Sequence, residues 1–391
     1  MNRVPVLWLC GPAGVGKSTV SWQLFTELTA AGVRAAFADT DQFCMCYPAP
    51  AGDPGRQHLK ALNVGSVIPS LAMSGAQCLI ANGVLDAAGL RTELLPAADV
   101  TICRLRARGE EVERRFAVRH SPYDEGDLAG MRQQTRDEVL VMDRSSFADA
   151  TVDTTGVPAA EVAAAVRAAC PDWPGFAGDL PEPPNRPDAP DVAACSQDQD
   201  HRPVGGQVLL ITGPTGVGKS TIGFPCYLSC LGAGVTAGYL DLDQLGFLRP
   251  GDPRDPGNHR LKARNLGTIW RNYRDAGATH LVAVGPMSTE ADVRLYAEAL
   301  PGASVTLVRL RAEPDDLRQR IASRGAGGSW PQPGDPLAGQ SPEFLAAVAA
   351  ETIRDGHALD RSGLGALTVD TTGLAVAESA ALLCSAAGWP A

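Results

Sequence analysis

The chain has 391 residues, 45% of them hydrophobic, and 34 Lys and Arg residues stand against 44 Asp and Glu residues. This composition is that of a globular protein, and the length favours two domains. A net charge of −10 gives no general electrostatic reason to bind nucleic acid or membranes, so we expect a small-molecule partner. There is no run of 18 apolar residues, and the first strand leads directly into a glycine-rich loop. We therefore expect a cytoplasmic protein without a membrane span or a secretory signal.

Short apolar runs rich in β-forming residues alternate with amphipathic stretches along the first half of the chain. The predicted strands are Val4–Cys10, Ala35–Ala38, Gln77–Ala81, Val100–Leu105 and Thr151–Val152. Helices are predicted over Ser18–Ala30 and Glu161–Ala169 from their apolar periodicity and end signals. This alternation is typical of βαβ units, so it predicts a parallel five-stranded sheet between two layers of helices.

The second half repeats the first. At an offset of 202 residues the segment 11–19 matches 213–221, 39–42 matches 241–244, and 59–65 matches 261–267. The corresponding predicted strands are Gln207–Thr212, Thr236–Leu240, His280–Val284, Ser304–Leu310 and Ala366–Val369. Residues 171–206 contain eight prolines, which indicates an extended linker. We predict two tandem three-layer α/β/α domains, residues 1–175 and 206–391, joined by a linker over residues 176–205.

Each half contains a phosphate-loop (P-loop) pattern between a predicted strand and a predicted helix, which is the context that the pattern requires. The loop residues expected to bind ATP are Gly11, Gly14, Gly16, Lys17, Ser18 and Thr19, and Gly213, Gly216, Gly218, Lys219, Ser220 and Thr221. In such loops backbone N–H groups surround the phosphates, the Lys ammonium reaches the terminal phosphates, and the Ser hydroxyl binds Mg²⁺. The alternative is a copy that keeps the loop only as a turn.

A pair of aspartates follows the second predicted strand of each half, Asp39 with Asp41 and Asp241 with Asp243. The carboxyl end of that strand lies beside the P-loop crevice in such a sheet. The first carboxylate of each pair, Asp39 or Asp241, is predicted to hold Mg²⁺ with the P-loop serine. The second, Asp41 or Asp243, is predicted to orient or deprotonate an acceptor hydroxyl. The alternative is that these residues only cap a turn.

The chain has only four lysines, Lys17, Lys60, Lys219 and Lys262. A compact ammonium suits a phosphate loop better than a planar guanidinium, which explains Lys17 and Lys219. Lys60 and Lys262 each lie three residues before an asparagine, Asn63 or Asn265, and so share one helical face with it. These four residues are candidates for binding the acceptor. The alternative for the lysines is a solvated position inherited by duplication.

Together, the P-loops, the Asp-x-Asp pairs, an arginine-rich segment after the fourth strand and the Asp-Thr-Thr-Gly segments at 153–156 and 370–373 carry a resemblance. Both halves resemble small P-loop kinases of the shikimate, gluconate, adenylylsulfate and chloramphenicol-phosphotransferase kind, within the nucleoside monophosphate kinase group. The resemblance implies lid arginines that stabilise the transferring phosphate, here Arg115 and Arg119, and Arg320 and Arg324. Surface arginines paired with nearby acidic residues remain the alternative. The resemblance also implies that the Asp-Thr-Thr-Gly segments lie near the adenine of the nucleotide. A role as a helix N-cap would explain these segments equally.

Several features depart from that family. The triple glycine of shikimate kinases after the third strand is absent, and that strand carries no acidic residue at its end. Pro225 lies six residues after Lys219 and predicts a kink in the second P-loop helix, and the second half has a Gly/Pro-rich insertion over 325–339. The sequence therefore predicts an ATP- and Mg²⁺-dependent phosphotransferase with an unidentified small acceptor. The alternative is a nucleotide sensor that hydrolyses ATP slowly, and a kinase of nucleic-acid ends is disfavoured by the acidic charge.

Overall fold

A computed structural model describes residues 3–85, 92–119, 125–182, 205–328, 334–365 and 367–390. Side chains are not described at residues 116–131 and 134. Most of the predicted linker, residues 183–204, and part of the predicted insertion, residues 329–333, lie outside these ranges. The chain forms two compact units. The first comprises Met1–Cys44, Asp53–Ala189 and Phe247–Asn258, and the second comprises Met45–Gly52, Pro190–Gly246 and His259–Ala391.

The first unit is built on a six-stranded sheet with the order β6-β5-β1-β4-β2-β9. Five of these strands are parallel to one another: β1 (Val4–Cys10), β2 (Ala35–Asp39), β4 (Cys78–Gly83), β5 (Ala98–Arg106) and β6 (Ala150–Asp153). Each overlaps one of the predicted strands of this half, and only the predicted strand Gln77–Ala81 begins one residue before the observed strand. The central strand β1 is buried along its whole length, as expected for a strand covered on both faces.

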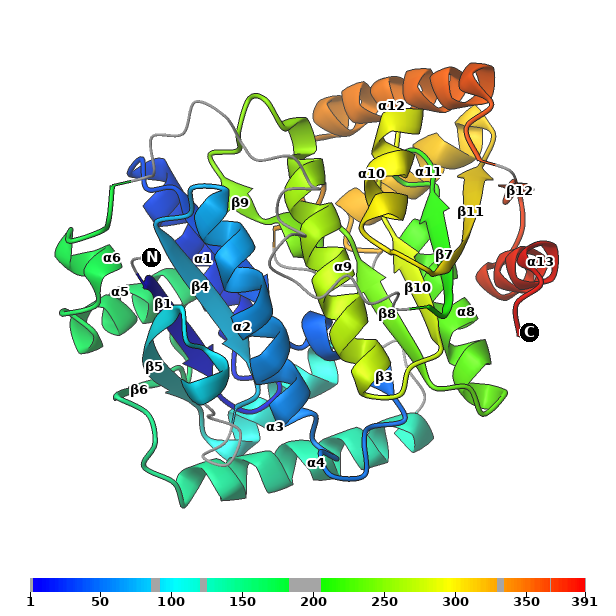
Figure 1. The fold of residues 1–391 in the computed structure, drawn as a ribbon. Coiled ribbons are helices and arrows are strands. Elements are labelled where there is room, and N and C mark those ends of the chain that lie inside the picture. Colours follow the sequence, from blue (N-terminus) through cyan, green and yellow to red (C-terminus); the bar gives the residue numbers. More distant parts are fainter. Residues whose placement is uncertain are drawn as a thin grey trace. The chain divides into compact units, whose positions relative to one another are not determined.

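Helices cover this sheet (Figure 1). The core that contains Leu7 and Leu9 of β1 also contains apolar residues of α1 and α5. The helices of the unit are α1 (Lys17–Ala30), α2 (Gln57–Met73), α3 (Gly109–Arg119), α4 (Glu125–Asp143), α5 (Ala159–Ala169) and α6 (Pro174–Ala177). The predicted helices over Ser18–Ala30 and Glu161–Ala169 are confirmed to within two residues.

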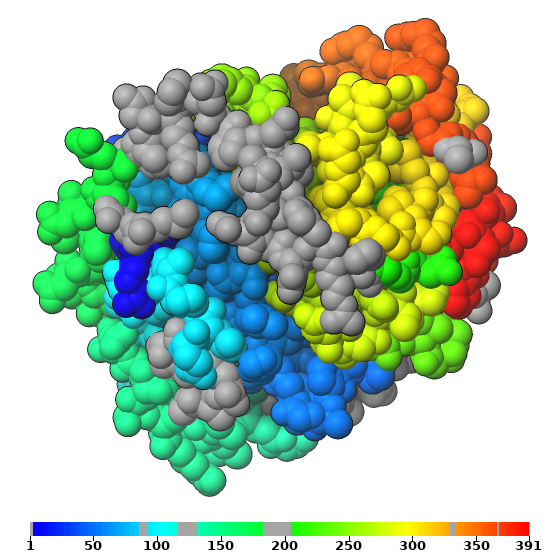
Figure 2. Space-filling view, viewed as in Figure 1, coloured from blue at the N-terminus to red at the C-terminus, as the bar shows by residue number. Residues whose placement is uncertain are grey.

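The second unit repeats this arrangement with the strand order β12-β11-β7-β10-β8-β3. Its parallel strands are β7 (Gln207–Thr212), β8 (Ala237–Asp241), β10 (His280–Val284), β11 (Ser304–Arg311) and β12 (Leu367–Asp370). Its helices are α8 (Lys219–Gly232), α9 (His259–Asp275), α10 (Glu290–Glu298), α11 (Pro314–Gly325), α12 (Pro342–Ser362) and α13 (Val376–Ala387). In the space-filling view, α12 is the orange surface of this unit (Figure 2).

The sixth strand of each sheet corrects the predicted five-stranded parallel sheet. In the first unit it is β9 (Leu248–Arg249), which pairs antiparallel with β2 at Ala35 and Ala36. In the second unit it is β3 (Cys46–Tyr47), which pairs antiparallel with β8. Each half of the chain thus supplies the edge strand of the other half's sheet. A two-residue strand has too little hydrophobic pattern to be predicted, because backbone pairing alone defines it.

Two further expectations concern helices. The helix α8 continues through Pro225 from Lys219 to Gly232, so the proline does not break it. Among the described residues, no helix is both long enough and apolar enough to cross a membrane.

Candidate functional site

The first P-loop connects the central strand β1 to α1. Its glycines adopt positive φ angles, 79° at Gly14 and 100° at Gly16, which L side chains rarely adopt. A Cβ atom added to Gly11 would lie 2.4 Å from the carbonyl oxygen of Leu105, so the loop also needs glycine for space. The ammonium of Lys17 is buried and donates to the carbonyl of Pro12 over 3.0 Å. The loop therefore has the shape that lets backbone N–H groups surround an anion.

The hydroxyl of Ser18, at the start of α1, meets two oxygen groups from neighbouring strands. Its Oγ donates to Asp39 Oδ2 over 3.2 Å and lies 3.0 Å from Asn82 Oδ1. Because β2 and β4 are paired in register at Asp39 and Asn82, both side chains reach the serine from the same sheet edge. Hydroxyl, carboxylate and amide oxygens are the hard donors that suit Mg²⁺. These three residues therefore fit a magnesium ion, with Ser18 and Asp39 as predicted.

Asp39 and Asp41 lie in different electrostatic surroundings. Burial and the neighbouring charge of Asp41 raise the pKa of Asp39 to about 6, so a proton competes with a cation for this carboxylate near pH 6. Desolvation would also raise the pKa of Asp41, but the ammonium groups of Lys60 and Lys17 outweigh it and hold that pKa below its usual value. Asp41 is thus ionised at neutral pH, and 44% of its side chain is exposed.

Lys60 holds Asp41 in place. Its Nζ donates to Asp41 Oδ1 and to the carbonyl of Val84, each over 2.6 Å. The Lys60 side chain is 3% exposed. Asn63, one turn further along α2, is also buried. It donates to the carbonyl of Phe43, which lies two residues after Asp41 in the chain. The structure therefore places Lys60 and Asn63 behind Asp41 as positioning residues, rather than on an open acceptor surface.

The corresponding residues of the second unit make similar hydrogen bonds. Lys219 Nζ donates to the carbonyls of Gly213 and Pro214, and Ser220 Oγ donates to Asp241 Oδ2 over 2.9 Å. Lys262 Nζ donates to Asp243 Oδ1 over 2.6 Å, and Asn265 donates to the carbonyl of Leu245. The pKa of Asp241 is again raised to about 6 by burial and by Asp243. Both units bring together the P-loop, the aspartate pair and the lysine that the sequence singled out.

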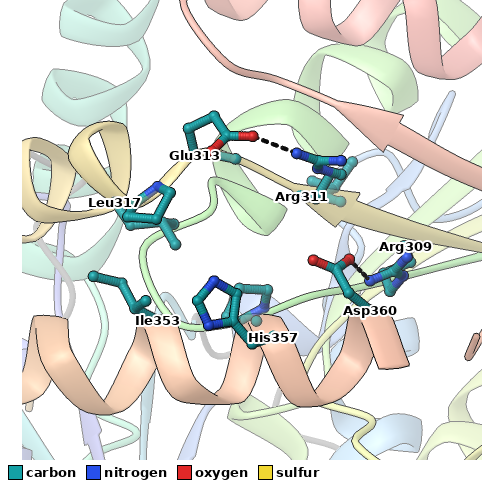
Figure 3. Close-up of a pocket in the computed structure, with 12 residues that line it drawn as sticks. Arg309, Arg311, Glu313, Leu317, Ile353, His357 and Asp360 are labelled. Carbon is teal, nitrogen blue, oxygen red and sulfur yellow. Dashed lines mark hydrogen bonds and ion pairs between the residues drawn. The ribbon is translucent and has the colours of Figure 1, made fainter. Parts of the chain in front are cut away.

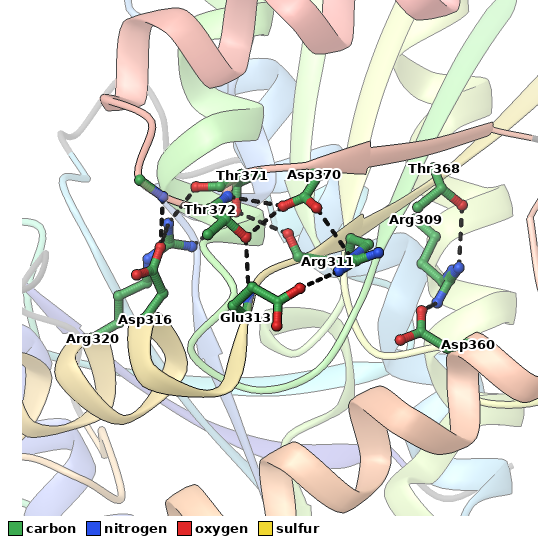
Figure 4. Close-up of polar contacts among 11 residues, drawn as sticks. Arg309, Arg311, Glu313, Asp316, Arg320, Asp360, Thr368, Asp370, Thr371 and Thr372 are labelled. Atoms are coloured by element: carbon green, nitrogen blue, oxygen red, sulfur yellow. Dashed lines mark hydrogen bonds and ion pairs between the residues drawn. The ribbon is translucent and has the colours of Figure 1, made fainter.

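Arg115 and Arg320 join each P-loop to the segment after the last parallel strand. In the second unit Arg320 donates to the carbonyl and the hydroxyl of Thr371 over 2.7 and 2.9 Å (Figure 4), and to the carbonyl of Val217 over 2.9 Å. Arg115 makes the same three contacts with Val15 and Thr154. In this structure these two predicted lid arginines fix the back of the P-loop. Arg115 is also paired with Glu111, as the alternative interpretation anticipated.

The other two predicted lid arginines are less alike. Arg324 pairs with Asp335 over 2.7 Å, and its charge acts on the pKa of Lys219. Arg119 lies at the end of α3, but its side chain is outside the described part of the chain. In the Asp-Thr-Thr-Gly segments, Thr154 and Thr371 are buried. Both face the arginine contacts described above and do not cap a helix.

Glu138 is a site residue that the sequence analysis missed. Its Oε2 accepts a hydrogen bond of 3.2 Å from the backbone N–H of Ala13 in the P-loop. It is contributed by α4, and its charge acts on the pKa of Lys17. A carboxylate on a P-loop N–H occupies a position that suits a phosphate oxygen. No local motif could have revealed it, because 125 residues separate it from the loop.

We expect the Glu138→Gln variant to bind ADP more tightly at the first P-loop. The amide keeps the size of the side chain but removes the negative charge that competes with phosphate, which should give about a three- to tenfold gain. Calorimetry on Glu138→Gln in a Lys219→Ala background would isolate the first site. The matched control is Asp355→Asn, since Asp355 is the exposed counterpart in α12. Unchanged or weaker ADP binding would contradict this role of Glu138.

A cavity of about 140 Å³ lies at the carboxyl end of β11 in the second unit (Figure 3). Arg309, Arg311, Glu313, His357 and Asp360 line it. Its charges are largely paired with one another, Arg309 with Asp360 and Arg311 with Glu313. It is lined by neither aspartate of the Asp241 pair, so it is separate from the predicted acceptor position.

Comparisons with known proteins give structural neighbours only. No family model and no curated protein matches the chain. The chain is similar in structure to a tunicamycin resistance protein of Deinococcus radiodurans, with 19% identity, a TM-score of 0.33, and coverage of 47% of this chain and 96% of that one. It is also similar to a gluconokinase of Sinorhizobium meliloti (14%, TM-score 0.31, 48% and 94%). A third neighbour is the APS kinase of Mycobacterium tuberculosis in complex with AMPPNP and APS (19%, 0.29, 46% and 96%).

Proposed function

We propose that this protein is a tandemly duplicated, ATP- and Mg²⁺-dependent phosphotransferase that acts on a small metabolite carrying a hydroxyl or phosphate group. The observation that carries the proposal is the ionised, half-exposed Asp41 beside the P-loop, held by a buried lysine. A P-loop alone would serve any nucleotide-binding protein. A carboxylate fixed beside the terminal phosphate position is what a transferase needs to orient the attacking hydroxyl.

The roles of the residues follow from their positions. The P-loop N–H groups and Lys17 would bind the β- and γ-phosphates, and Ser18 with Asp39 would hold Mg²⁺, which would supply positive charge to the transferring phosphate. Asp41 accepts a hydrogen bond from the acceptor hydroxyl and takes its proton as the oxygen attacks. Lys60 and Asn63 keep Asp41 and its loop in place. The corresponding residues of the second unit, which are candidates for a second nucleotide site, are Lys219, Ser220, Asp241, Asp243, Lys262 and Asn265.

The second candidate function is a nucleotide sensor that binds ATP and hydrolyses it slowly. The Lys60–Asp41 and Lys262–Asp243 pairs favour the transferase, because a sensor has no need of a positioned carboxylate at each acceptor position. We also propose a cytoplasmic protein with a small-molecule acceptor and no nucleic-acid or membrane partner, on the basis of its acidic charge.

An acceptor screen tests the transferase against the sensor. ADP release from the purified full-length protein is measured with ATP and Mg²⁺ against a panel of sugars, sugar acids, nucleosides, aminoglycosides and other hydroxylated metabolites. A many-fold rise with one acceptor, together with a phosphorylated product seen by mass spectrometry, supports the transferase. A slow rate that no acceptor changes would support the sensor.

A further inference from the structure

The two units differ at three buried positions near the P-loop, one in the helix that follows the loop, one directly after the second strand and one in the neighbouring strand. In the first unit these positions are Ser21, Thr40 and Asn82, and all three are fully buried. At the repeat offset of 202 the second unit has Gly223, Leu242 and Val284. One site therefore has a polar wall where the other has an apolar wall. The P-loop residues themselves match except at Ala13 and Thr215, so this difference lies mainly in the surroundings of the loop rather than in the phosphate loop itself.

Contacts in the second unit show how these positions face one another. A Cβ atom added to Gly223 would lie 2.6 Å from Val284 Cγ1, so residues 223 and 284 oppose each other across the gap between α8 and β10. Likewise, a Cβ atom added to Gly285 would lie 2.6 Å from Leu242 Cβ, and one added to Gly83 would lie 2.0 Å from Thr40 Oγ1. In the second unit the side chains of Leu242 and Val284 thus occupy this space with carbon atoms only.

The polar wall of the first unit contains hydroxyl groups whose hydrogen-bonding capacity is not used by the described residues. Asn82 Oδ1 lies 3.0 Å from Ser18 Oγ. The hydroxyls of Ser21 and Thr40 have no hydrogen-bond partner among the described residues. Buried hydroxyls without partners are rare and usually contact an ordered water or ion. These two hydroxyls, together with the Asn82 amide against Ser18, are suited to the water shell that Mg²⁺ retains in proteins.

The second unit also has a tyrosine that interacts with its P-loop serine, Ser220. Tyr239 replaces Phe37 at the repeat offset, and the Tyr239 side chain is hydrogen-bonded with Ser220. The Ser220 hydroxyl therefore has partners within the protein in both Tyr239 and Asp241. The serine hydroxyl has protein partners in both units, but a cation beside Ser220 would find no side-chain oxygen on residues 223, 242 or 284, where the first unit has the Asn82 amide.

We infer that the two sites have different roles: the first P-loop binds the hydrated divalent cation with its nucleotide and carries out phosphoryl transfer, and the second binds nucleotide with at least tenfold weaker cation affinity. Asn82 is then a positioning residue that acts through Ser18 and the cation's water shell. Loss of such an outer contact costs about 10–100-fold in metal affinity. Only the assignment of phosphoryl transfer to the first site rests on the proposed function. The difference in cation affinity does not, because it can be measured without any acceptor.

The test measures Mn²⁺ binding to the full-length protein in the presence of ADP, from the electron paramagnetic resonance signal of free Mn²⁺. The Lys219→Ala variant reports the first site and the Lys17→Ala variant reports the second. We expect tight Mn²⁺ binding only in Lys219→Ala. In that background, Asn82→Val should weaken Mn²⁺ binding about 10–100-fold, and Thr40→Val, which removes one hydroxyl at constant size, should weaken it to a lesser degree. Val284→Ala in the same Lys219→Ala background is the matched control, because it changes only the second unit and should leave Mn²⁺ binding at the first site unchanged.

Equal Mn²⁺ affinities in the two lysine variants would overturn the inference, as would an Asn82→Val variant that is folded and binds Mn²⁺ normally. If Asn82→Val does not fold, by thermal unfolding, the lysine pair and Thr40→Val still decide the question. A protein that binds no ADP at either site would instead refute the proposed function. If the two sites bind Mn²⁺ unequally but the protein phosphorylates no acceptor, the inferred difference in cation affinity holds and only the proposed transferase activity is refuted.

Discussion

Lys17→Ala will reduce phosphoryl transfer by at least 10²–10³-fold, the order found when one preorganised donor is removed from a developing anion. Lys17 is the only lysine of the first P-loop, and its buried ammonium already points into the loop toward the carbonyl of Pro12. A bound triphosphate would exchange that carbonyl for phosphate oxygens. Transfer is measured as acceptor-dependent ADP release under saturating ATP.

Lys219→Ala is the matched comparison, because both lysines donate to the carbonyl of the P-loop proline in their own unit, Pro12 or Pro214. If the first site carries out the transfer, Lys219→Ala should retain most of the turnover, and the double variant should be inactive. Lys17→Arg keeps the charge but presents a planar fork that the narrow loop does not fit, so it should also be impaired. A double Lys→Ala variant with full activity would show that the P-loops are not the catalytic centres.

The fold was predictable where the signal is local. The parallel strands from β1 to β12 appear in the sequence because each is a short apolar run, and parallel strands are buried on both faces. The edge strands Cys46–Tyr47 and Leu248–Arg249 were not predictable, since two residues carry no pattern. Their pairing partner is a strand about 200 residues away, which only the tertiary structure selects.

The candidate site shows the same division. The P-loops and the aspartate pairs are contiguous motifs, so the sequence named them directly. The helical spacing of Lys60 and Asn63 indicated a shared face, but it could not reveal that this face points at Asp41 and Phe43. Asn82 contacts Ser18 because β4 lies between β1 and β2. The sequence shows Asn82-Gly83 and no acidic residue at the end of this strand, but it does not reveal the contact of Asn82 with Ser18. Glu138 was out of reach, because only folding brings α4 to the P-loop.

Asp41→Asn separates chemistry from binding in the first unit. Asn has nearly the same shape and can still accept a hydrogen bond from Lys60, but it cannot take a proton from an acceptor hydroxyl. We expect the rate of transfer to fall about 10²–10⁴-fold, the usual contribution of a general base, while the affinity for ADP changes little because the P-loop is untouched. Single-turnover rates and calorimetry measure the two quantities separately.

The positioning role of Lys60 gives this prediction its internal check. Lys60→Met removes the ammonium that lowers the pKa of Asp41, so the pKa of Asp41 should rise and the acidic limb of the pH–rate profile should move to higher pH. Asp41→Asn should abolish that limb, because the titrating group is gone. Asp243→Asn, the same change in the second unit, should leave the rate nearly intact. An unchanged rate in Asp41→Asn would reduce Asp41 to a turn residue and would favour the sensor, since a sensor needs no base at this position.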